Sequence, residues 1–290
     1  MYATKVAPKL AAGAADAYYC SENGDFVLYR GDCRQILARM PDETVDLIFA
    51  DPPYFLSNGG ITCQSGRMVS VNKGHWDRSQ GVNQMHEFNV EWLRECQRVL
   101  KPNGTIFVSG TRHVIFSVGF AMQQLGYKVL NDIVWYKVIP PPNLCCRYFT
   151  HGTETIIWAA RSAKSKHYFD YPTMKAENGG KQMQNLWNIT PPLKAEKRFG
   201  KHPTQKPIAL LERIVVAASP AGALVVDPFN GCGTTGVACA RLGRDYIGVE
   251  LEAEYLERSV LRYEDLEGER APQPKPRTKR KKSADIRRVK

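Results

Sequence analysis

The chain has 290 residues, of which 43% are hydrophobic and 24% are charged, so it has the composition of a globular protein with a buried core. Its net charge of +11 is uneven, because residues 271–290 hold nine basic residues and one acidic residue. No apolar run approaches the ~18 residues that span a bilayer and no signal peptide is recognisable, which favours a cytoplasmic protein without membrane contacts.

Strand and helix patterns alternate along the first half of the chain. Short apolar runs bounded by turn residues predict strands at 25–32, 45–54, 105–110, 132–138 and 154–162. Apolar residues at helical spacing predict helices at 33–40, 88–102 and 114–126. The polar stretch 55–85 is rich in Gly, Asn and Ser, and we expect it to be a long mobile loop.

The second half begins with 163–201, which is rich in Lys, Asn, Gln, Tyr and Trp and has no regular period. The elements expected after it are a helix within 202–219, a strand at 223–229, a turn and helix at 230–243, a strand at 245–251 and a helix at 252–266. Strands that alternate with helices predict a parallel α/β sheet with helices on both faces. Ligands bind such sheets at the carboxyl ends of the strands, where every unusual motif of this sequence lies.

A glycine-rich motif follows the strand at 223–229. Gly231, Gly233 and Gly236 have G-x-G-x-x-G spacing between a strand and a helix, and Glu250 ends the next strand. Glycines at such a turn let the backbone approach a nucleoside cofactor, and the acid accepts hydrogen bonds from ribose hydroxyls. Asp227, just before the loop, would repel a pyrophosphate but suits an ammonium group. This favours S-adenosylmethionine over a nicotinamide.

A second motif, Asp51-Pro52-Pro53-Tyr54, ends the strand at 45–54. One interpretation is a strand-ending turn, because proline cannot continue a central strand. The other is a site for the exocyclic amine of a base. The Asp51 carboxylate and the Pro52 carbonyl would accept its two N–H groups, since prolines fix the backbone. Tyr54 would stack on the base after it has flipped out of the duplex.

The order of these motifs, with DPPY first, then HPTQKP and then DPFNGCGTTG, resembles the beta group of DNA amino-methyltransferases. The restriction–modification enzymes of the MboII and RsrI kind look most similar, and the resemblance runs from Gly31 to about Leu266. It implies an α/β fold with a doubly wound, mostly parallel, seven-stranded Rossmann-like sheet in circularly permuted order. It also implies an irregular target-recognition insertion and site-specific transfer of a methyl group from S-adenosylmethionine to an amine of DNA.

The resemblance divides the chain into an N-terminal extension (1–24), a catalytic half (25–162), a target-recognition segment (163–201), a cofactor-binding half (202–268) and a basic tail (269–290). The catalytic residues would be Asp51, Pro52, Pro53 and Tyr54. The cofactor-binding residues would be Asp32, Cys33, His202, Thr204, Gln205, Lys206, Asp227, Phe229, Gly231, Cys232, Gly233, Thr234, Thr235, Glu250 and Leu251. Asp32 would accept a hydrogen bond from the cofactor adenine, and it also suits the N-cap of the helix at 33–40.

Contacts with double-stranded DNA are expected from the irregular parts of the chain, which supply basic and aromatic side chains. The candidates are Arg67, Lys73, Trp76, Arg78, Lys194, Lys197 and Arg198. Ordinary solvent-exposed loops are the alternative. The basic tail is expected to be disordered and to contact phosphates, or else only to aid solubility.

The chemistry of the target stays open between adenine N6 and cytosine N4. An Asp before Pro-Pro-Tyr resembles the adenine enzymes, whereas a serine is commoner in the cytosine enzymes. Cytosine C5 methylation would need a nucleophilic cysteine, and Cys63 lacks the Pro-Cys-Gln context. Methylation of an amine in RNA or protein, a non-catalytic DNA-binding protein and a nicotinamide dehydrogenase are further alternatives.

The expected surroundings follow from the same resemblance. We expect a bacterial, nucleoid-associated enzyme of a restriction–modification system that forms a homodimer, with a cognate endonuclease that it need not contact. The eight cysteines include no Cys-x-x-Cys pair, so we expect reduced thiols and no metal site.

Overall fold

The structure is a computed structural model that describes residues 16–270 apart from 56–60, 65–66, 71–80, 139, 141, 144–145 and 201. The strands of its main sheet are β1 (Tyr19–Cys20), β2 (Phe26–Arg30), β3 (Val45–Ala50), β6 (Leu100–Gly110), β7 (Lys128–Tyr136), β8 (Thr153–Ala160), β9 (Leu186–Asn188), β10 (Leu224–Asp227) and β11 (Asp245–Glu250). The α-helices are α1 (Cys33–Ala38), α2 (Val82–Val99), α3 (Ile115–Gln124), α4 (Tyr171–Glu177), α5 (Ile208–Ala218), α6 (Thr234–Leu242) and α7 (Ala253–Arg270). No helix in this part of the chain is long and apolar enough to cross a membrane.

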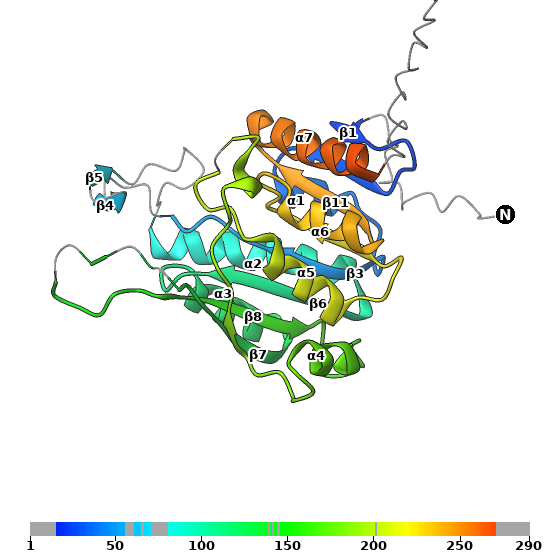
Figure 1. Ribbon diagram of the computed structural model, residues 1–290. Helices are drawn as coiled ribbons and strands as arrows, with labels where there is room; N and C mark the ends of the chain where they lie inside the picture. Colours follow the sequence, from blue (N-terminus) through cyan, green and yellow to red (C-terminus); the bar gives the residue numbers. More distant parts are fainter. Residues whose placement is uncertain are drawn as a thin grey trace, which may run out of the picture.

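The main sheet has the strand order β1-β2-β11-β10-β3-β6-β8-β7-β9 (Figure 1). The strands from β2 to β6 in this order are parallel, and β8 runs antiparallel to both of its neighbours. These strands with β7 form the mostly parallel, seven-stranded sheet that the sequence predicts. The two short strands β1 and β9 extend it at its edges, which makes nine strands in all.

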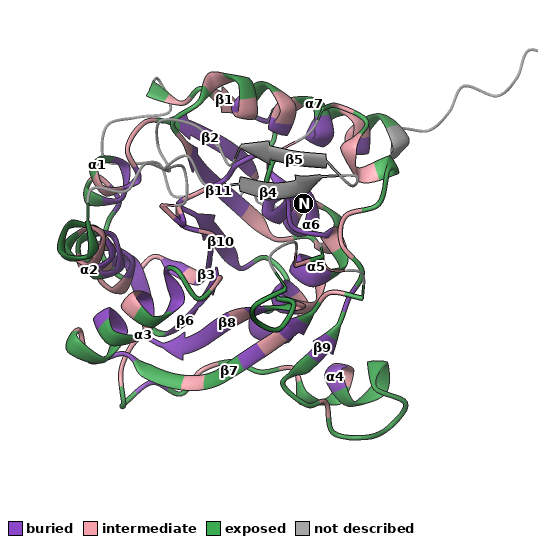
Figure 2. Cartoon of the chain, turned by 90° about the vertical axis from the view of Figure 1, so that its left-hand side faces the viewer, coloured by how far each residue is buried: buried purple, intermediate pink, exposed green. Residues whose placement is uncertain are grey.

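Helices cover both faces of the sheet, as expected for a doubly wound fold. The first core cluster joins α1, α2 and α3 to one face, and the second joins α5, α6 and α7 to the other. Side chains of the strands alternate between the clusters: in β3, Ile48 belongs to the first, and Leu47 and Phe49 belong to the second. This alternation is the two-residue period of a strand whose faces are both buried. Figure 2 shows the buried strands between the two groups of helices.

Two predicted elements have different bounds in the structure. Helix α2 starts at Val82, six residues earlier than predicted, and ends at Val99, because Leu100 is extended and pairs with Val45 as β6 begins. The loop expected at 55–85 therefore ends at Gly81, and residues 82–85 belong to α2. It also contains an antiparallel pair of strands, β4 (Ile61–Gln64) and β5 (Arg67–Ser70). The mobility expected of this loop falls mainly on residues outside the described part of the chain.

The segment 163–201, predicted to recognise the target, packs against the sheet and α5. The Ser165 hydroxyl donates to the Pro102 carbonyl near the start of β6 at 2.6 Å, and the Asp170 N–H donates to the Ala217 carbonyl at the end of α5 at 2.9 Å. Helix α4 therefore lies at the amino end of the parallel strands, in the lower right of Figure 1. The chain then returns along the sheet edge as β9, in register with β7.

Candidate active site

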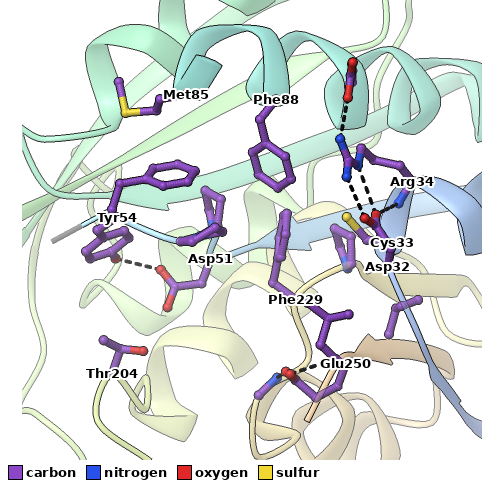
Figure 3. Close-up of a pocket in the computed structure, with 18 of the residues that line it drawn as sticks. Asp32, Cys33, Arg34, Asp51, Tyr54, Met85, Phe88, Thr204, Phe229 and Glu250 are labelled. Carbon is purple, nitrogen blue, oxygen red and sulfur yellow. Dashed lines mark hydrogen bonds and ion pairs between the residues drawn. The ribbon is translucent and has the colours of Figure 1, made fainter. Parts of the chain in front are cut away.

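A cavity of about 490 Å³ opens at the carboxyl edge of the parallel strands (Figure 3). Its walls come from the ends of β2, β3, β10 and β11 and from the first half of α2. Its volume falls within the ~300–1,000 Å³ range of small-molecule sites. A second pocket of about 30 Å³ shares Asp51, His202, Thr204, Phe229 and Gly231 with the large cavity, so the two adjoin.

The predicted site residues gather around these two spaces. The large cavity is lined by Asp32, Cys33, Asp51, Pro52, Pro53, Tyr54, His202, Thr204, Phe229, Gly231, Glu250 and Leu251. The small pocket adds Gln205, Lys206, Asp227, Cys232, Thr234 and Thr235. Gly233 lines neither. Its φ is +75°, and a Cβ there would lie 2.0 Å from the Ser259 hydroxyl oxygen, so this glycine lets α7 pack against the loop.

Asp51 lies where the two spaces meet, and its carboxylate is held on both oxygens. Oδ1 accepts hydrogen bonds from the Tyr54 hydroxyl at 2.7 Å and from the Ser109 hydroxyl at 2.5 Å. Oδ2 accepts from Lys206 Nζ at 2.5 Å. Figure 3 shows the Tyr54 hydroxyl pointing at Asp51. Ser109 is the second-last residue of the neighbouring strand β6, Tyr54 follows β3 and Lys206 precedes α5, so three parts of the fold fix this carboxylate.

Lys206 lines the small pocket and also contacts Asp51. The sequence places it among the cofactor residues, but its ammonium contacts Asp51, the Tyr54 hydroxyl at 3.2 Å and Glu154 Oε2 at 3.6 Å. Burial lowers the pKa of Lys206, but the two carboxylates outweigh it and the pKa is raised, so the side chain is a permanent cation. Tyr54 is only 5% exposed, and burial together with Asp51 holds its pKa well above the usual value. Its hydroxyl is therefore a neutral donor.

Glu250 is positioned by backbone N–H groups. Oε2 accepts from Gly231 at 2.8 Å, and Oε1 accepts from Leu251 at 2.9 Å and Glu252 at 3.0 Å. Burial raises its pKa, and these three donors partly offset that effect. Gly231 has φ +51°, which favours glycine. The loop and the acid at the end of β11 therefore hold each other in place.

Asp227 is the most deeply buried acid of the site, at 3% exposure. It accepts hydrogen bonds from the Thr235 hydroxyl at 2.6 Å and the Phe229 N–H at 2.9 Å. Burial raises its pKa to about 7, against the lowering effect of these two donors, and Asp51 and Glu250 raise it further. This carboxyl therefore gains or loses its charge close to neutral pH.

Asp32 occupies the N-cap of α1, as its position in the sequence suggests. Its Oδ1 accepts from the Arg34 N–H at 2.9 Å, and its Oδ2 is paired with the Arg34 guanidinium at 2.6 Å. The hydrogen bond from Arg34 holds the pKa of Asp32 below its usual value, although burial opposes this. Arg34 also pairs with Glu91 of α2 at 2.6 Å, so this pairing ties two walls of the cavity together.

The predicted DNA contacts are only partly placed by the structure. Lys194 is exposed and Lys197 is half-buried, whereas Arg198 forms an ion pair with Asp265 of α7. For Arg67 the structure describes only a place in β5. The remaining three candidates, Lys73, Trp76 and Arg78, lie outside the described residues.

Several lining residues are missing from the sequence-based set. Met85 and Phe88 belong to α2: Met85 lies before the predicted helix 88–102, and Phe88 is its first residue. Tyr255 comes from α7. Ser109 and Glu154 surround Asp51 and Lys206. A polar residue at the end of the buried strand 105–110, and a lone acid in the apolar run at 154–162, are the signals that could have identified these two.

The charge of the large cavity suits the donor that the sequence predicts. Five acidic residues line it, namely Asp32, Asp51, Glu87, Glu91 and Glu250. The single Lys or Arg among its lining residues is Arg34, which is already paired with two of those acids. An acidic lining attracts a sulfonium and an ammonium and disfavours a pyrophosphate. Among the described residues, no cluster of three His, Cys, Asp or Glu side chains could hold a metal ion.

Comparisons with known proteins identify the family of the chain. The model of the N6/N4 family, described as DNA methylase, matches residues 45–261. The type II methyltransferase M2.DpnII of Streptococcus pneumoniae is 52% identical over 239 residues, which is 82% of this chain and 89% of that protein.

Two solved structures are also similar. The complex of M1.HpyAVI with S-adenosylmethionine has 27% identity and a TM-score of 0.63, and covers 82% of this chain and 98% of its own. The cytosine-N4-specific PvuII DNA methyltransferase has 21% identity and a TM-score of 0.66, covers 82% of this chain and 86% of its own, and supports the fold alone. The expected fold, enzyme class and cofactor are confirmed. The chain therefore belongs to the N6/N4 family of DNA methylases and is an S-adenosylmethionine-dependent DNA methyltransferase.

Proposed function

We propose that this DNA methyltransferase modifies the exocyclic N6 amine of an adenine that has flipped out of double-stranded DNA. The observation that carries the proposal is the Asp51 carboxylate, which three donors hold at the edge of the cavity. A carboxylate in this position can accept an N–H of an amine and oppose the positive charge that grows on its nitrogen. A serine at position 51, which the family resemblance associates with the cytosine-N4 enzymes, could not supply that charge.

In this proposal the chain supplies acceptors and position, and no covalent intermediate with the enzyme forms. When bound, S-adenosylmethionine supplies an electrophilic methyl group on its sulfonium sulfur. Asp51 accepts one N–H of the amine and the Pro52 carbonyl accepts the other, which leaves the nitrogen lone pair available. The methylated nitrogen then passes one proton to the Asp51 carboxylate, which releases it to solvent. Ser109 and Tyr54 donate to Oδ1 throughout and keep the carboxylate oriented.

We also propose how the donor is held. The Glu250 carboxylate would bind the ribose hydroxyls, Asp227 the ammonium group, and Asp32 with Cys33 the adenine. His202, Thr204 and Phe229 line both spaces and would cover the methionine end. Support comes from their common position around the large acidic cavity and the small pocket that adjoins it. Gly233 would contribute indirectly, by letting α7 pack against the loop that holds the donor.

The substrate DNA would approach the carboxyl edge of the sheet, because the cavity opens there. Lys194 and Lys197 remain our candidates for phosphate contacts, whereas α4 lies at the opposite end. The relatives named as type II methyltransferases support a role in a bacterial restriction–modification system. A cognate endonuclease, a homodimer and a location at the nucleoid in the cytoplasm are parts of the same proposal.

The test is to incubate the protein with plasmid DNA and S-adenosylmethionine that carries a labelled methyl group, and then to digest the DNA to nucleosides. The expected product is N6-methyladenine, formed by the wild type and not by Asp51→Asn. Label in N4-methylcytosine would contradict the choice of base. Label found only in RNA or protein would refute DNA as the substrate.

A further inference from the structure

Asp51 is the first of a row of four charged side chains of alternating sign. Lys206 Nζ lies 2.5 Å from Asp51 Oδ2 and 3.6 Å from Glu154 Oε2. Glu154 Oε1 in turn lies 2.5 Å from Lys137 Nζ. Asp51 follows β3, Lys206 precedes α5, Glu154 lies in β8 and Lys137 follows β7. The row thus runs from the cavity towards the edge of the sheet.

The inner members of this row are deeply buried. The side chains of Lys206 and Glu154 are 5% and 9% exposed, whereas that of Lys137 is 25% exposed. Glu154 Oε2 is a buried oxygen without a hydrogen bond, since its nearest cation is the Lys206 ammonium at 3.6 Å. A buried acceptor in this state is costly. We therefore expect a function of Glu154 that would offset this cost.

Charge provides that function. Lys206 alone would neutralise Asp51, because an ammonium at 2.5 Å cancels most of the field of a carboxylate. With Glu154 on the other side of the ammonium, the three groups nearest the target carry one negative charge. Lys137, beyond Glu154, lies farthest from the target and its side chain is 25% exposed, so solvent screens its positive charge more strongly. The target nitrogen becomes positive as the methyl group bonds to it, so a net negative group beside it lowers the barrier.

We propose that Glu154 is a positioning residue that acts through Lys206: it balances the ammonium, so that Asp51 is held rigidly and still presents a net negative charge to the target amine. This inference rests on the proposed function of Asp51. It adds that Lys206 and Glu154 work as a unit, in which Lys206 fixes the carboxylate and Glu154 preserves its charge. Neither residue needs to gain or lose a proton during the reaction, because Lys206 stays charged between its two carboxylates.

The experiment measures single-turnover transfer of a labelled methyl group to plasmid DNA, and in parallel the KM for S-adenosylmethionine. Glu154→Gln keeps the shape of the side chain and removes its charge. We expect its transfer rate constant to fall about tenfold, which corresponds to about 1.4 kcal/mol, with KM for the donor changed less than about twofold. Glu154→Asp keeps the charge and should recover at least half of the lost rate.

A double variant separates charge from structure. Glu154→Gln with Lys206→Met removes one negative and one positive charge, so Asp51 regains its net charge. We expect it to transfer faster than Glu154→Gln alone. If Glu154 has only a structural role, the double variant should transfer more slowly than Glu154→Gln, because it also loses the contact of Lys206 with Asp51. If Glu154→Gln does not fold, the double variant alone tests the charge argument, because replacing a buried ion pair by uncharged side chains is often tolerated. It should then stay within about tenfold of the wild type.

Lys101→Met is the matched control, because Lys101 pairs with Asp46 at 2.7 Å in the same sheet but away from the cavity. We expect wild-type transfer from it. A wild-type rate in Glu154→Gln, or a loss that appears only in KM, or a double variant slower than the single variant, overturns the inference. The proposed function fails separately, namely if Asp51→Asn retains full transfer.

Discussion

Binding of the methyl donor should depend on pH through Asp227. Its pKa is raised from 3.8 to about 7 by burial, with Asp51 and Glu250 nearby as further anions. If Asp227 pairs with the donor's ammonium, only its ionised form binds well. About three pKa units correspond to about 4 kcal/mol for ionising this group in the free protein. Below pH 7 the apparent affinity for S-adenosylmethionine should therefore fall about tenfold per pH unit.

The free energy of unfolding should depend on pH in the opposite direction to the affinity for the donor. Because the pKa of Asp227 is raised on folding, the folded protein keeps a proton that the unfolded chain loses above about pH 4. The contribution of this group is therefore greatest below that pH and declines as the pH rises to about 7. Asp227→Asn should remove this decline. It should also make donor binding weak at every pH.

Isothermal titration calorimetry from pH 5.5 to 8.5, in two buffers of different ionisation enthalpy, tests both statements. The wild type should release close to one proton on binding the donor at pH 6 and almost none at pH 8. Thermal unfolding of the free protein and of Asp227→Asn over the same range is the companion measurement. A wild-type affinity that is flat between pH 6 and pH 7, or proton uptake on binding, would refute the reasoning.

Three further outcomes follow from particular residues. Gly233→Ala should destabilise the protein by ~2 kcal/mol or more in denaturant unfolding, since φ is +75° and its Cβ would lie 2.0 Å from a serine oxygen of α7. Gly243→Ala, with φ +67° and open space, should cost only about 1 kcal/mol, and equal costs would contradict the packing argument. Removing 271–290 should reduce the salt dependence of DNA binding, and an unchanged slope would mean that the tail does not touch phosphates. Lys197→Glu should weaken DNA binding in a mobility-shift assay more than Lys175→Glu at the far end of the sheet, and the reverse order would contradict the proposed approach of DNA.

The sequence predicts the central fold well because its elements carry strong local signals. The strands at 45–50 and 224–227 are buried apolar runs, and α7 shows helical spacing over several turns. The sequence does not predict the start of α2 at Val82, because residues 82–87 are mostly polar and several of them face the cavity, so they lack a clear apolar period. The edge strands β1 and β9 have two and three residues, too few for any periodic signal.

The site was only partly predictable, for a similar reason. Motifs such as DPPY and the glycine loop consist of neighbours in sequence, so spacing reveals them. The partner of Asp51 is Lys206, which lies 155 residues away, and no spacing rule links the two. Likewise, the composition of 163–201 suggests DNA contacts, but no local signal reveals that Asp170 packs against the end of α5, which places the first half of the segment at the amino end of the parallel strands. Only the tertiary contacts of the chain decide such questions.

The central claim is that one cavity has two parts with separate tasks: Asp51 acts on the target amine, and Asp227 holds the donor. The most direct test measures methyl transfer and donor affinity together in Asp51→Ala and Asp227→Ala. Asp51→Ala should abolish transfer while S-adenosylmethionine binds with an affinity within a few-fold of the wild type, whereas Asp227→Ala should lose donor affinity. A loss of donor affinity in Asp51→Ala as severe as that in Asp227→Ala would contradict this division of roles.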